Sequence, residues 1–481
     1  MGYALTRFVM LRLVGLTYLC AFGVFLQQGP ALIGEHGLLP AAAFLPGTTF
    51  FEAPSVFRFI GTADGTLVAI GWLGAGLSVL VLLGCTNAVV MALLWVLYLS
   101  VDGVGQTFWS FGWESQLLET GFLSIFFCPL FSVTPFPKRP APLALIYLYR
   151  WLGFRLFIGA GLIKLRGDAC WVELTCLDFH FETQPIPSPL TPFFHFLPAW
   201  AHKAGVLFNH LAELVAPWGF FGPRVVRRVC GLVAIAFQLT LIASGNLSFL
   251  NWLSLIPLIA CLDDGLLQHL FPQRLTAPLA LAERETSSLQ HRWVAGVLTA
   301  VVAILSLQVV ENLVSKRQHM NRTYDPFSLV NTYGAFGTVG RERDELVIEG
   351  SDDGGATWRA YELKCKPGDP DRRPCWMSPF HFRLDWQVWF AAMSTADNEP
   401  WLVHLIWKLL HHDVGARSLL ANDPFPTAAP GLIRVRLFGY QLKRYGEPGW
   451  WSRTEKGEWL QPVSADTPEL RAFIDAYGWL E

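Results

Sequence analysis

The chain has 481 residues, of which 52% are hydrophobic and only 15% are charged. Soluble globular proteins carry about 25% charged residues, so the composition excludes an ordinary soluble protein and predicts an integral membrane protein. The 20 Trp and 36 Phe residues are side chains that membrane interfaces and interiors favour. A formal net charge of -2 argues against a basic nucleic-acid-binding surface, so we expect no nucleic-acid partner.

The first predicted membrane span covers residues 8–27. Arg12 interrupts the apolar run, and no small-residue cleavage site follows it, so the run does not have the form of a cleaved signal peptide. A helix needs about 20 mostly apolar residues to cross a bilayer. Residues 202–221 form a weaker ninth candidate, whose polar content is typical of an interfacial or re-entrant helix. The other predicted spans are 66–84, 86–104, 117–134, 143–165, 225–245, 247–262 and 293–311.

Charge alternates between the loops that join these spans. Loops 135–142 and 222–228 are basic and loop 263–292 carries Arg274, Arg284 and Arg292, whereas loops 28–65 and 166–201 are rich in Asp and Glu. Lys and Arg gather in cytoplasmic loops. Nine spans with a cytoplasmic N-terminus fit this distribution, and they place the C-terminal part of the chain in a periplasm or an endoplasmic reticulum lumen.

Polar side chains within the spans mark either structural pairs or a polar cavity, because a charge at the centre of a membrane helix costs about 2.5–3.5 kcal/mol. An ion pair of Arg155 with Glu114 or Glu119 is the economical explanation for the deepest arginine. Long side chains near the ends of a span usually extend to the interface, which is the simplest expectation for Arg150 and Lys164. The predicted intramembrane polar cluster contains Glu114, Glu119, Arg150, Arg155, Lys164, Asp168, Asn209, Glu213 and Asn251.

The stretch "LRGDACWVELTCLDFHFETQPIPSPL" follows Lys164 and leaves the membrane on the predicted outer side. Its prolines predict a stiff, structured loop. Disulfides persist in oxidising compartments. We predict a bond between Cys365 and Cys375, which flank the short polar segment "KPGDPDRRP". For Cys170 and Cys176 the sequence favours neither a bond nor free thiols.

The composition changes after the last span, so we predict a transmembrane domain over residues 1–315 and an extracytoplasmic β-rich domain over 316–481. Alternating strands such as "LIRVRLFGYQL" (432–442) predict a β-sandwich, with a helical insertion near 383–413. One tight β-hairpin carries an Asp box, a pattern that is structural in the folds that contain it and is no evidence for a glycosidase. Its residues are Ser351, Asp353, Gly355, Thr357 and Trp358.

Sequence motifs for common catalytic chemistry are missing. The chain contains no zinc-spaced His and Cys set, P-loop, nucleophile elbow or dinucleotide fingerprint. The stretch "GAGLSVLVLLG" indicates close helix packing rather than a phosphate-binding loop. We therefore expect no metal and no cofactor.

Several long blocks closely resemble the lipase maturation factor family. They are "GWESQLLETGFL", "YRWLGFRLFIGAGLIKLRGDACWVELTCLDFHFETQPIPSPL", "FNHLAELVAPW", "SGNLSFLNWLSLIPLIACLDD", "VNTYGAFGTVGRERDELVIEGSDDGGATW" and "FRLDWQVWFAAM". The resemblance implies a polytopic membrane protein that helps dimeric lipases reach their folded, active form, with a lipase or another secreted or membrane protein as client. The compact chain and its short loops suggest a bacterial inner-membrane homologue; animal members reside in the endoplasmic reticulum.

One segment also resembles, more distantly, the vitamin K-dependent gamma-carboxylase, through Lys164, Leu165, Asp168 and Trp171. A lysine of this region serves that enzyme as a base, so Lys164 is a candidate catalytic residue. The alternative function is therefore a membrane enzyme for a quinone-like or lipid substrate, with Lys164, Glu119 and Arg155 in one cavity. We favour a non-catalytic maturation factor, in which Lys164 and Glu119 act through structure or pocket polarity rather than through turnover, with a buried pair of the two as one form of this role.

Overall fold

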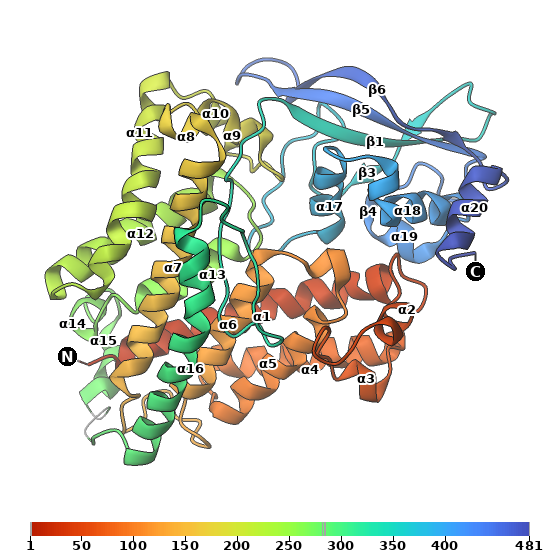
Figure 1. The fold of residues 1–481 in the computed structure, drawn as a ribbon. Helices are drawn as coiled ribbons and strands as arrows, with labels where there is room; N and C mark the ends of the chain where they lie inside the picture. Colours follow the sequence, from red (N-terminus) through yellow and green to blue (C-terminus); the bar gives the residue numbers. More distant parts are fainter. Residues whose placement is uncertain (1, 281, 283–284, 481) are drawn as a thin grey trace.

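The fold is given by a computed structural model that describes residues 2–280, 282 and 285–480. A helical bundle formed by the first two thirds of the chain carries a sheet-containing C-terminal domain at one end (Figure 1). Within the described residues, five helices are long and apolar enough to cross a membrane. They are α1 (Ala4–Ile33), α4 (Asp64–Leu83), α7 (Leu143–Gly167), α12 (Arg224–Ser244) and α16 (Leu289–Val314).

Shorter helical segments fill the bundle between these five. The nine predicted spans are not confirmed, because α5 (Ala88–Asp102), α6 (Gly112–Phe127) and α13 (Leu250–Ile259) are shorter than a bilayer-crossing helix. The weak ninth candidate is broken into α11 (Ala199–His210), the π-helical turn η3 (Leu211–Val215) and the 3-10 segment η4 (Ala216–Phe221).

The α1 and α4 helices pack antiparallel and very closely. A Cβ atom at Gly74 would lie 2.4 Å from the Phe22 ring, and one at Gly71 would lie 2.6 Å from Leu26. Only glycine leaves room for these side chains, which is the usual role of small residues between membrane helices. Gly74 belongs to the stretch that predicted helix packing.

Short helices lie in the connections. Between α1 and α6 they are α2 (Ala41–Phe44), η1 (Leu45–Gly47), α3 (Phe57–Ile60) and η2 (Gln106–Trp109). The loop after α7 contains α8 (Ala169–Val172), α9 (Leu177–Thr183) and α10 (Thr191–His195), at the same end of the bundle as the C-terminal domain (Figure 1). At the other end lie α14 (Asp264–Leu267), α15 (Gln273–Thr276) and η5 (Ala277–Ala280).

The C-terminal domain is built on a four-stranded antiparallel sheet in the order β2-β1-β5-β6. Leu346 of β1 pairs with Leu437 of β5, and the strand pairs extend over the whole length of β1. Strand β1 is almost entirely buried, whereas β6 is exposed along most of its length. The bounds are β1 (Arg343–Ser351), β2 (Arg359–Ala360), β5 (Leu432–Leu442) and β6 (Trp451–Val463), with a separate pair of β3 (Glu362–Leu363) and β4 (Leu420–Asn422).

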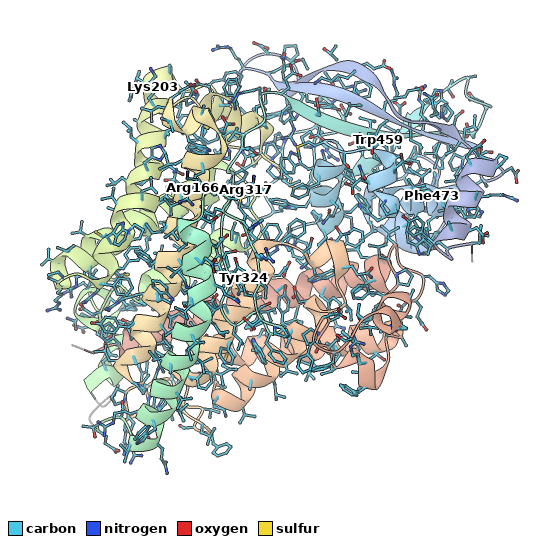
Figure 2. The ribbon with its side chains drawn as sticks, in the orientation of Figure 1. Arg166, Lys203, Arg317, Tyr324, Trp459 and Phe473 are labelled. Atoms are coloured by element: carbon cyan, nitrogen blue, oxygen red, sulfur yellow. A yellow bond between two sulfur atoms is a disulfide. The ribbon has the colours of Figure 1, made fainter. Side chains whose placement is uncertain are left out.

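Helices, rather than a second large sheet, cover the inner face of this sheet (Figure 1). The predicted sandwich is therefore not confirmed, although the alternating strands are present and the helical insertion near 383–413 is real. Trp459 of β6, labelled in Figure 2, donates a 2.9 Å hydrogen bond to the Ser394 carbonyl in that insertion. The helical segments are α17 (Arg383–Ala391), η6 (Ala396–Asn398), α18 (Pro400–Leu410), α19 (Val414–Ser418) and the C-terminal α20 (Pro468–Ala476).

The segment between α16 and β1 connects the two parts of the molecule. It begins beside the end of α7, where Arg166 donates a 2.6 Å hydrogen bond to Gln318, then descends along the bundle past Arg317 and Tyr324 (Figure 2). It then rises to β1 (Figure 1). This descent brings residues 331–333 next to α6 and α7.

Candidate functional site

Most of the predicted polar residues lie where the bundle meets the C-terminal domain, but they form three separate clusters rather than one. The first is centred on Glu119 of α6 and Arg155 of α7, both only 1% exposed, which form an ion pair. Arg155 also donates a 2.7 Å hydrogen bond to the Asn331 carbonyl. Glu119 accepts hydrogen bonds from the Asn331 backbone N–H at 3.1 Å and from the Tyr333 hydroxyl at 2.8 Å. The two opposite charges are thus held together by groups from α6, α7 and residues 331–333.

The second cluster joins Glu114 of α6 to Arg383 of α17, across 269 residues of sequence. Arg383 Nη1 lies 2.8 Å from a Glu114 carboxylate oxygen, and both side chains are at most 1% exposed. The hydroxyl of Tyr98 donates a hydrogen bond to the same carboxylate. The Arg383 guanidinium lies 3.8 Å from the centre of the Trp109 ring. This cluster fastens the helical layer of the C-terminal domain to the bundle.

The third cluster contains Lys164 of α7, which lies within 2.6 Å of both Glu213 carboxylate oxygens. Its ammonium also donates a 2.9 Å hydrogen bond to Asn209 Oδ1 and lies 5.1 Å from the centre of the Trp171 ring. Glu213 belongs to the π-helical turn η3, a rare geometry that is frequent at functional sites. The turn carries Glu213 to the face of the helix that meets Lys164.

This arrangement differs from the sequence expectations in three ways. Lys164 pairs with Glu213, not with Glu119, because the broken helix lies beside the end of α7. Neither Lys164 nor Arg150 extends to the interface: Lys164 is 4% exposed and Arg150 is 1% exposed. Arg150 makes none of the contacts of the three clusters and donates hydrogen bonds to the Ala260 carbonyl and the Tyr3 hydroxyl. Asn251 is also separate, since it donates to Gln238 at 2.8 Å.

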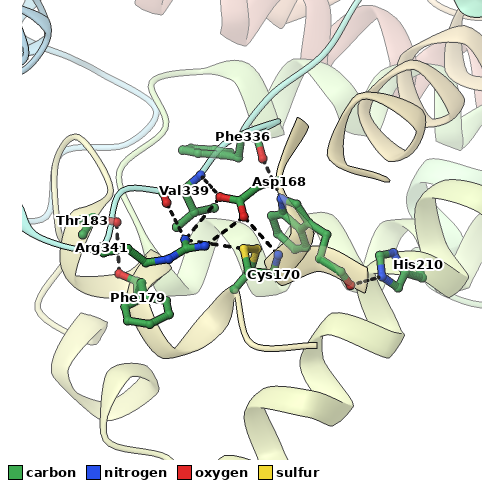
Figure 3. The surroundings of a disulfide bond; sticks show 10 residues. Asp168, Cys170, Phe179, Thr183, His210, Phe336, Val339 and Arg341 are labelled. Atoms are coloured by element: carbon green, nitrogen blue, oxygen red, sulfur yellow. Dashed lines mark hydrogen bonds and ion pairs between the residues drawn. A yellow bond between two sulfur atoms is a disulfide. The ribbon is translucent and has the colours of Figure 1, made fainter. Parts of the chain in front are cut away.

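Asp168, the remaining member of the predicted cluster, organises the loop after α7 (Figure 3). Its carboxylate accepts hydrogen bonds from the backbone N–H groups of Cys170 at 3.0 Å and Val339 at 3.2 Å, and it pairs with Arg341 at 2.9 Å. Partial burial alone would raise the pKa of Asp168, but the hydrogen bonds from Arg341 and the two backbone groups outweigh it and lower the pKa. The loop and the segment leading to β1 are thereby joined.

Both sequence-local cysteine pairs are bonded, Cys170 to Cys176 and Cys365 to Cys375. The first disulfide is buried beside Asp168 and Arg341 (Figure 3), which resolves the question that the sequence left open. The second lies beside the buried Lys366.

Arg343, at the start of β1, holds the loop after α7 against the sheet. It donates hydrogen bonds to the carbonyl oxygens of Glu182 at 2.7 Å, of Gln184, and of Pro185 at 3.0 Å. Its charge is balanced by Glu345 at 2.6 Å, and burial lowers the pKa of Arg343 to about 9. A buried arginine with this many carbonyl partners fixes the position of the loop.

The Asp box forms the tight turn that its sequence predicted. Asp353 accepts hydrogen bonds from the Thr357 backbone N–H at 2.9 Å and from the Thr357 hydroxyl at 2.6 Å, and Gly355 has a positive φ of 92°. Hydrogen bonds from Thr357 and Ser351 lower the pKa of Asp353. The Trp358 ring packs against the Arg434 guanidinium, 4.1 Å from the ring centre. Ser351, Asp353, Gly355 and Thr357 therefore shape the turn, and Trp358 packs against the sheet.

The sequence did not reveal several partners in these clusters, chiefly Asn331, Tyr333, Arg341, Arg343 and Arg383. Arg383 and Arg343 belong to segments that the sequence assigns to a domain outside the membrane. Charged residues are common on the surface of such a domain, so these two did not stand out. The signal that could have found Asn331 and Tyr333 was the block "VNTYGAF", whose polar residues stand among apolar ones.

These clusters suit a structural role. In each of the three clusters a buried charge faces an opposite charge and makes at least one further hydrogen bond, and Lys164 is paired with Glu213. In the described residues, no group of three or more His, Cys, Asp or Glu could hold a metal ion. A hollow of about 470 Å³ on the C-terminal domain is lined by Trp407, His411, Arg471, Asp475 and Leu480, and shares no residue with the clusters.

The structure is that of a multi-pass membrane protein with a large domain at one end. Its long apolar helices can cross a bilayer, and buried ion pairs fix the C-terminal domain to them. Two family models match the chain in order: the lipase maturation factor transmembrane domain over residues 5–269 and the lipase maturation factor C-terminal domain over residues 329–461. The chain belongs to the lipase maturation factor family.

Curated relatives align over nearly the whole chain. Lipase maturation factor 1 of Bos taurus is 44% identical over 99% of this chain and 91% of its own length. The Homo sapiens protein of that name is 42% identical over 99% and 90%, and lipase maturation factor 2 of Homo sapiens is 29% identical over 100% and 85%. No solved structure matches the chain. These comparisons do not support the alternative of a carboxylase-related membrane enzyme.

Proposed function

We propose that this protein assists the folding or maturation of secreted or membrane client proteins such as lipases. The observation that carries the proposal is the ordered match of both family models, together with relatives named lipase maturation factors that align over 99% of the chain. The polar clusters agree with this role, because they position a domain rather than expose a reactive group.

The proposed topology has nine membrane crossings, with the C-terminal domain outside the cytoplasm. The basic loops 135–142 and 222–228 lie at one end of the bundle, and both disulfides lie at the other end with the sheet. The bacterial inner membrane is the proposed location; in a eukaryotic cell the equivalent membrane is the endoplasmic reticulum. The boundary between the two domains follows α16, near residue 315.

A client would meet the outer surface formed by the C-terminal domain and the loop after α7. That loop exposes apolar side chains, among them Val172 at 64% and Phe193 at 55%, and Trp200 at the start of α11 is 73% exposed. Exposed apolar surface is what a partly folded chain can bind. Arg343 and the Cys170–Cys176 disulfide hold this loop in one shape, so the surface is preorganised and binding orders few groups.

The test is lipase maturation in cells that lack their own maturation factor. A secreted dimeric lipase is co-expressed with this protein, and lipase activity per secreted lipase molecule is measured. We expect a several-fold rise over cells with an unrelated multi-pass membrane protein. Equal specific activity in the two cultures would contradict the proposal.

A matched pair of variants links the effect to the outer surface. Arg343→Met removes the hydrogen bonds to the loop after α7, whereas Arg359→Met removes an exposed pair with Asp352 in the same domain. Per molecule of folded protein, the first should lower client maturation and the second should not. Equal behaviour of the two variants would show that the position of the loop is irrelevant.

A further inference from the structure

Three arginines converge on one carboxylate at the end of the bundle opposite the C-terminal domain, where α12 begins (Figure 1). Arg224 and Arg227 each place a guanidinium nitrogen 3.0 Å from Asp263, and Arg228 places Nε 3.1 Å from it. The Asp263 side chain is 1% exposed. We call Arg224, Arg227, Arg228 and Asp263 the arginine cluster.

Among the residues that the structure describes, the three guanidinium groups outnumber the neighbouring carboxylates, Asp263 and Asp264. Asp264 accepts hydrogen bonds from the backbone N–H groups of Ala4, Leu5 and Thr6 at the start of α1, and its negative charge offsets part of the excess. Arg150 adds a fourth guanidinium nearby and donates to the Ala260 carbonyl at the end of α13. Burial would raise the pKa of Asp263, but hydrogen bonds from Arg228 and Arg224 lower it to about 2, so its single negative charge persists.

The arginine cluster is accessible, and an exposed apolar surface begins beside it. The Arg224 side chain is 43% exposed and that of Arg228 is 21% exposed. The 3-10 segment η4 runs directly into α12, and the two pack together. Between them they expose Trp218 at 67%, Phe221 at 42% and Val225 at 73%.

We propose that the arginine cluster binds the anionic headgroup of a phospholipid whose acyl chains lie along the outward faces of η4 and α12. Guanidinium groups pair with phosphate through parallel hydrogen bonds. Basic groups between membrane helices at the cytoplasmic boundary are typical headgroup sites. The side of the membrane rests on the proposed topology, whereas the chemistry of the site is independent of the client.

The full-length protein, purified in a non-ionic detergent, provides the test. Native mass spectrometry during titration with phosphatidylglycerol, and separately with phosphatidylcholine, measures the lipid retained by the protein. We expect saturable retention of phosphatidylglycerol at much lower concentration than phosphatidylcholine. Arg224→Gln with Arg228→Gln should raise the apparent dissociation constant about thirtyfold, since each basic residue near an anionic lipid contributes about fivefold.

The matched control is Arg139→Gln, which removes one positive charge at the same end of the bundle from an exposed pair with Glu285. It should leave phosphatidylglycerol retention unchanged. Should the double variant fail to fold, Arg224→Gln alone serves, because Arg224 is the most exposed of the three, and about a fivefold loss is expected.

A parallel experiment with inorganic phosphate distinguishes binding of a lipid from binding of a free anion. Inorganic phosphate should give less stabilisation against heat than phosphatidylglycerol at equal concentration, and Trp218→Ala should weaken lipid retention alone. Equal stabilisation by both ligands would overturn the lipid assignment. Equal retention of the two lipids, or wild-type retention by the double variant, would overturn the site itself.

Discussion

Removal of Lys164 should destabilise the protein rather than abolish a chemical step. Lys164→Met leaves the Glu213 carboxylate, 4% exposed, with Asn209 as its one remaining partner in the described part of the chain. Loss of one member of a buried ion pair costs about 3–5 kcal/mol, which is a large part of the stability of a typical folded protein. We therefore expect a marked fall in folded protein in the membrane.

Two double variants test which carboxylate is the partner. Lys164→Met with Glu213→Leu removes both charges of the pair, so most of the lost stability should return. Lys164→Met with Glu119→Gln should be worse than either single change, because it leaves both Glu213 and Arg155 without an opposite charge. Abundance of a fluorescent fusion after size-exclusion chromatography, with the thermal midpoint, measures each variant.

The same variants decide between the structural and the catalytic role of Lys164. Client maturation is divided by the amount of folded protein, and we expect the Lys164→Met with Glu213→Leu protein to retain most of it. A Lys164→Met protein that folds normally yet supports no maturation would refute this reasoning, as would a double variant that recovers stability with no activity.

Three further outcomes are expected. A reporter fused after the C-terminus that is active only in the cytoplasm should stay silent, and a strong signal would reverse the topology. Cys365→Ser with Cys375→Ser should cost about 2–3 kcal/mol, because the bond closes a loop between cysteines 10 residues apart, and a lower thermal midpoint measures it. The Asp168 pKa is lowered on folding, so its pair with Arg341 stabilises the protein above the unfolded pKa of about 3.9 and is lost as pH falls through the folded pKa. The difference in thermal midpoint between wild type and Arg341→Gln should accordingly stay constant from pH 7 to 5 and vanish in stronger acid.

The helices and turns could be predicted because their signals are local. The five long apolar helices follow from runs of hydrophobic residues. The Asp-box turn follows from Asp353, Gly355 and their neighbours, which determine the backbone within a few residues. The count of nine crossings needed more than hydropathy, since a ten-residue helix such as α13 depends on its neighbours for its place in the bundle.

The pairing of charges could be predicted only in part. That buried Glu and Arg residues need partners is a matter of free energy, and it led to Arg155 with Glu119 among the possibilities. The partner of Lys164, Glu213, lies 49 residues later in a break in a helix, which no periodicity in the sequence predicts. Arg150 was expected at the interface because the sequence shows that it lies near one end of a span. The sequence does not show that the carbonyl groups at the end of α13 lie beside it.

The long sequence separation inside the clusters has a consequence for synthesis. Glu114 is made 269 residues before Arg383, and Glu119 is made 212 residues before Asn331. Synthesis adds about 5–20 residues per second, so Arg383 is made roughly 13–54 s after Glu114. During that interval the half-made bundle carries unpaired carboxylates, so the nascent chain depends on other proteins or on water to shelter them. A protein that assists the maturation of other proteins would thus itself pass through a partly folded state, which lasts until the last third of its chain has been synthesised.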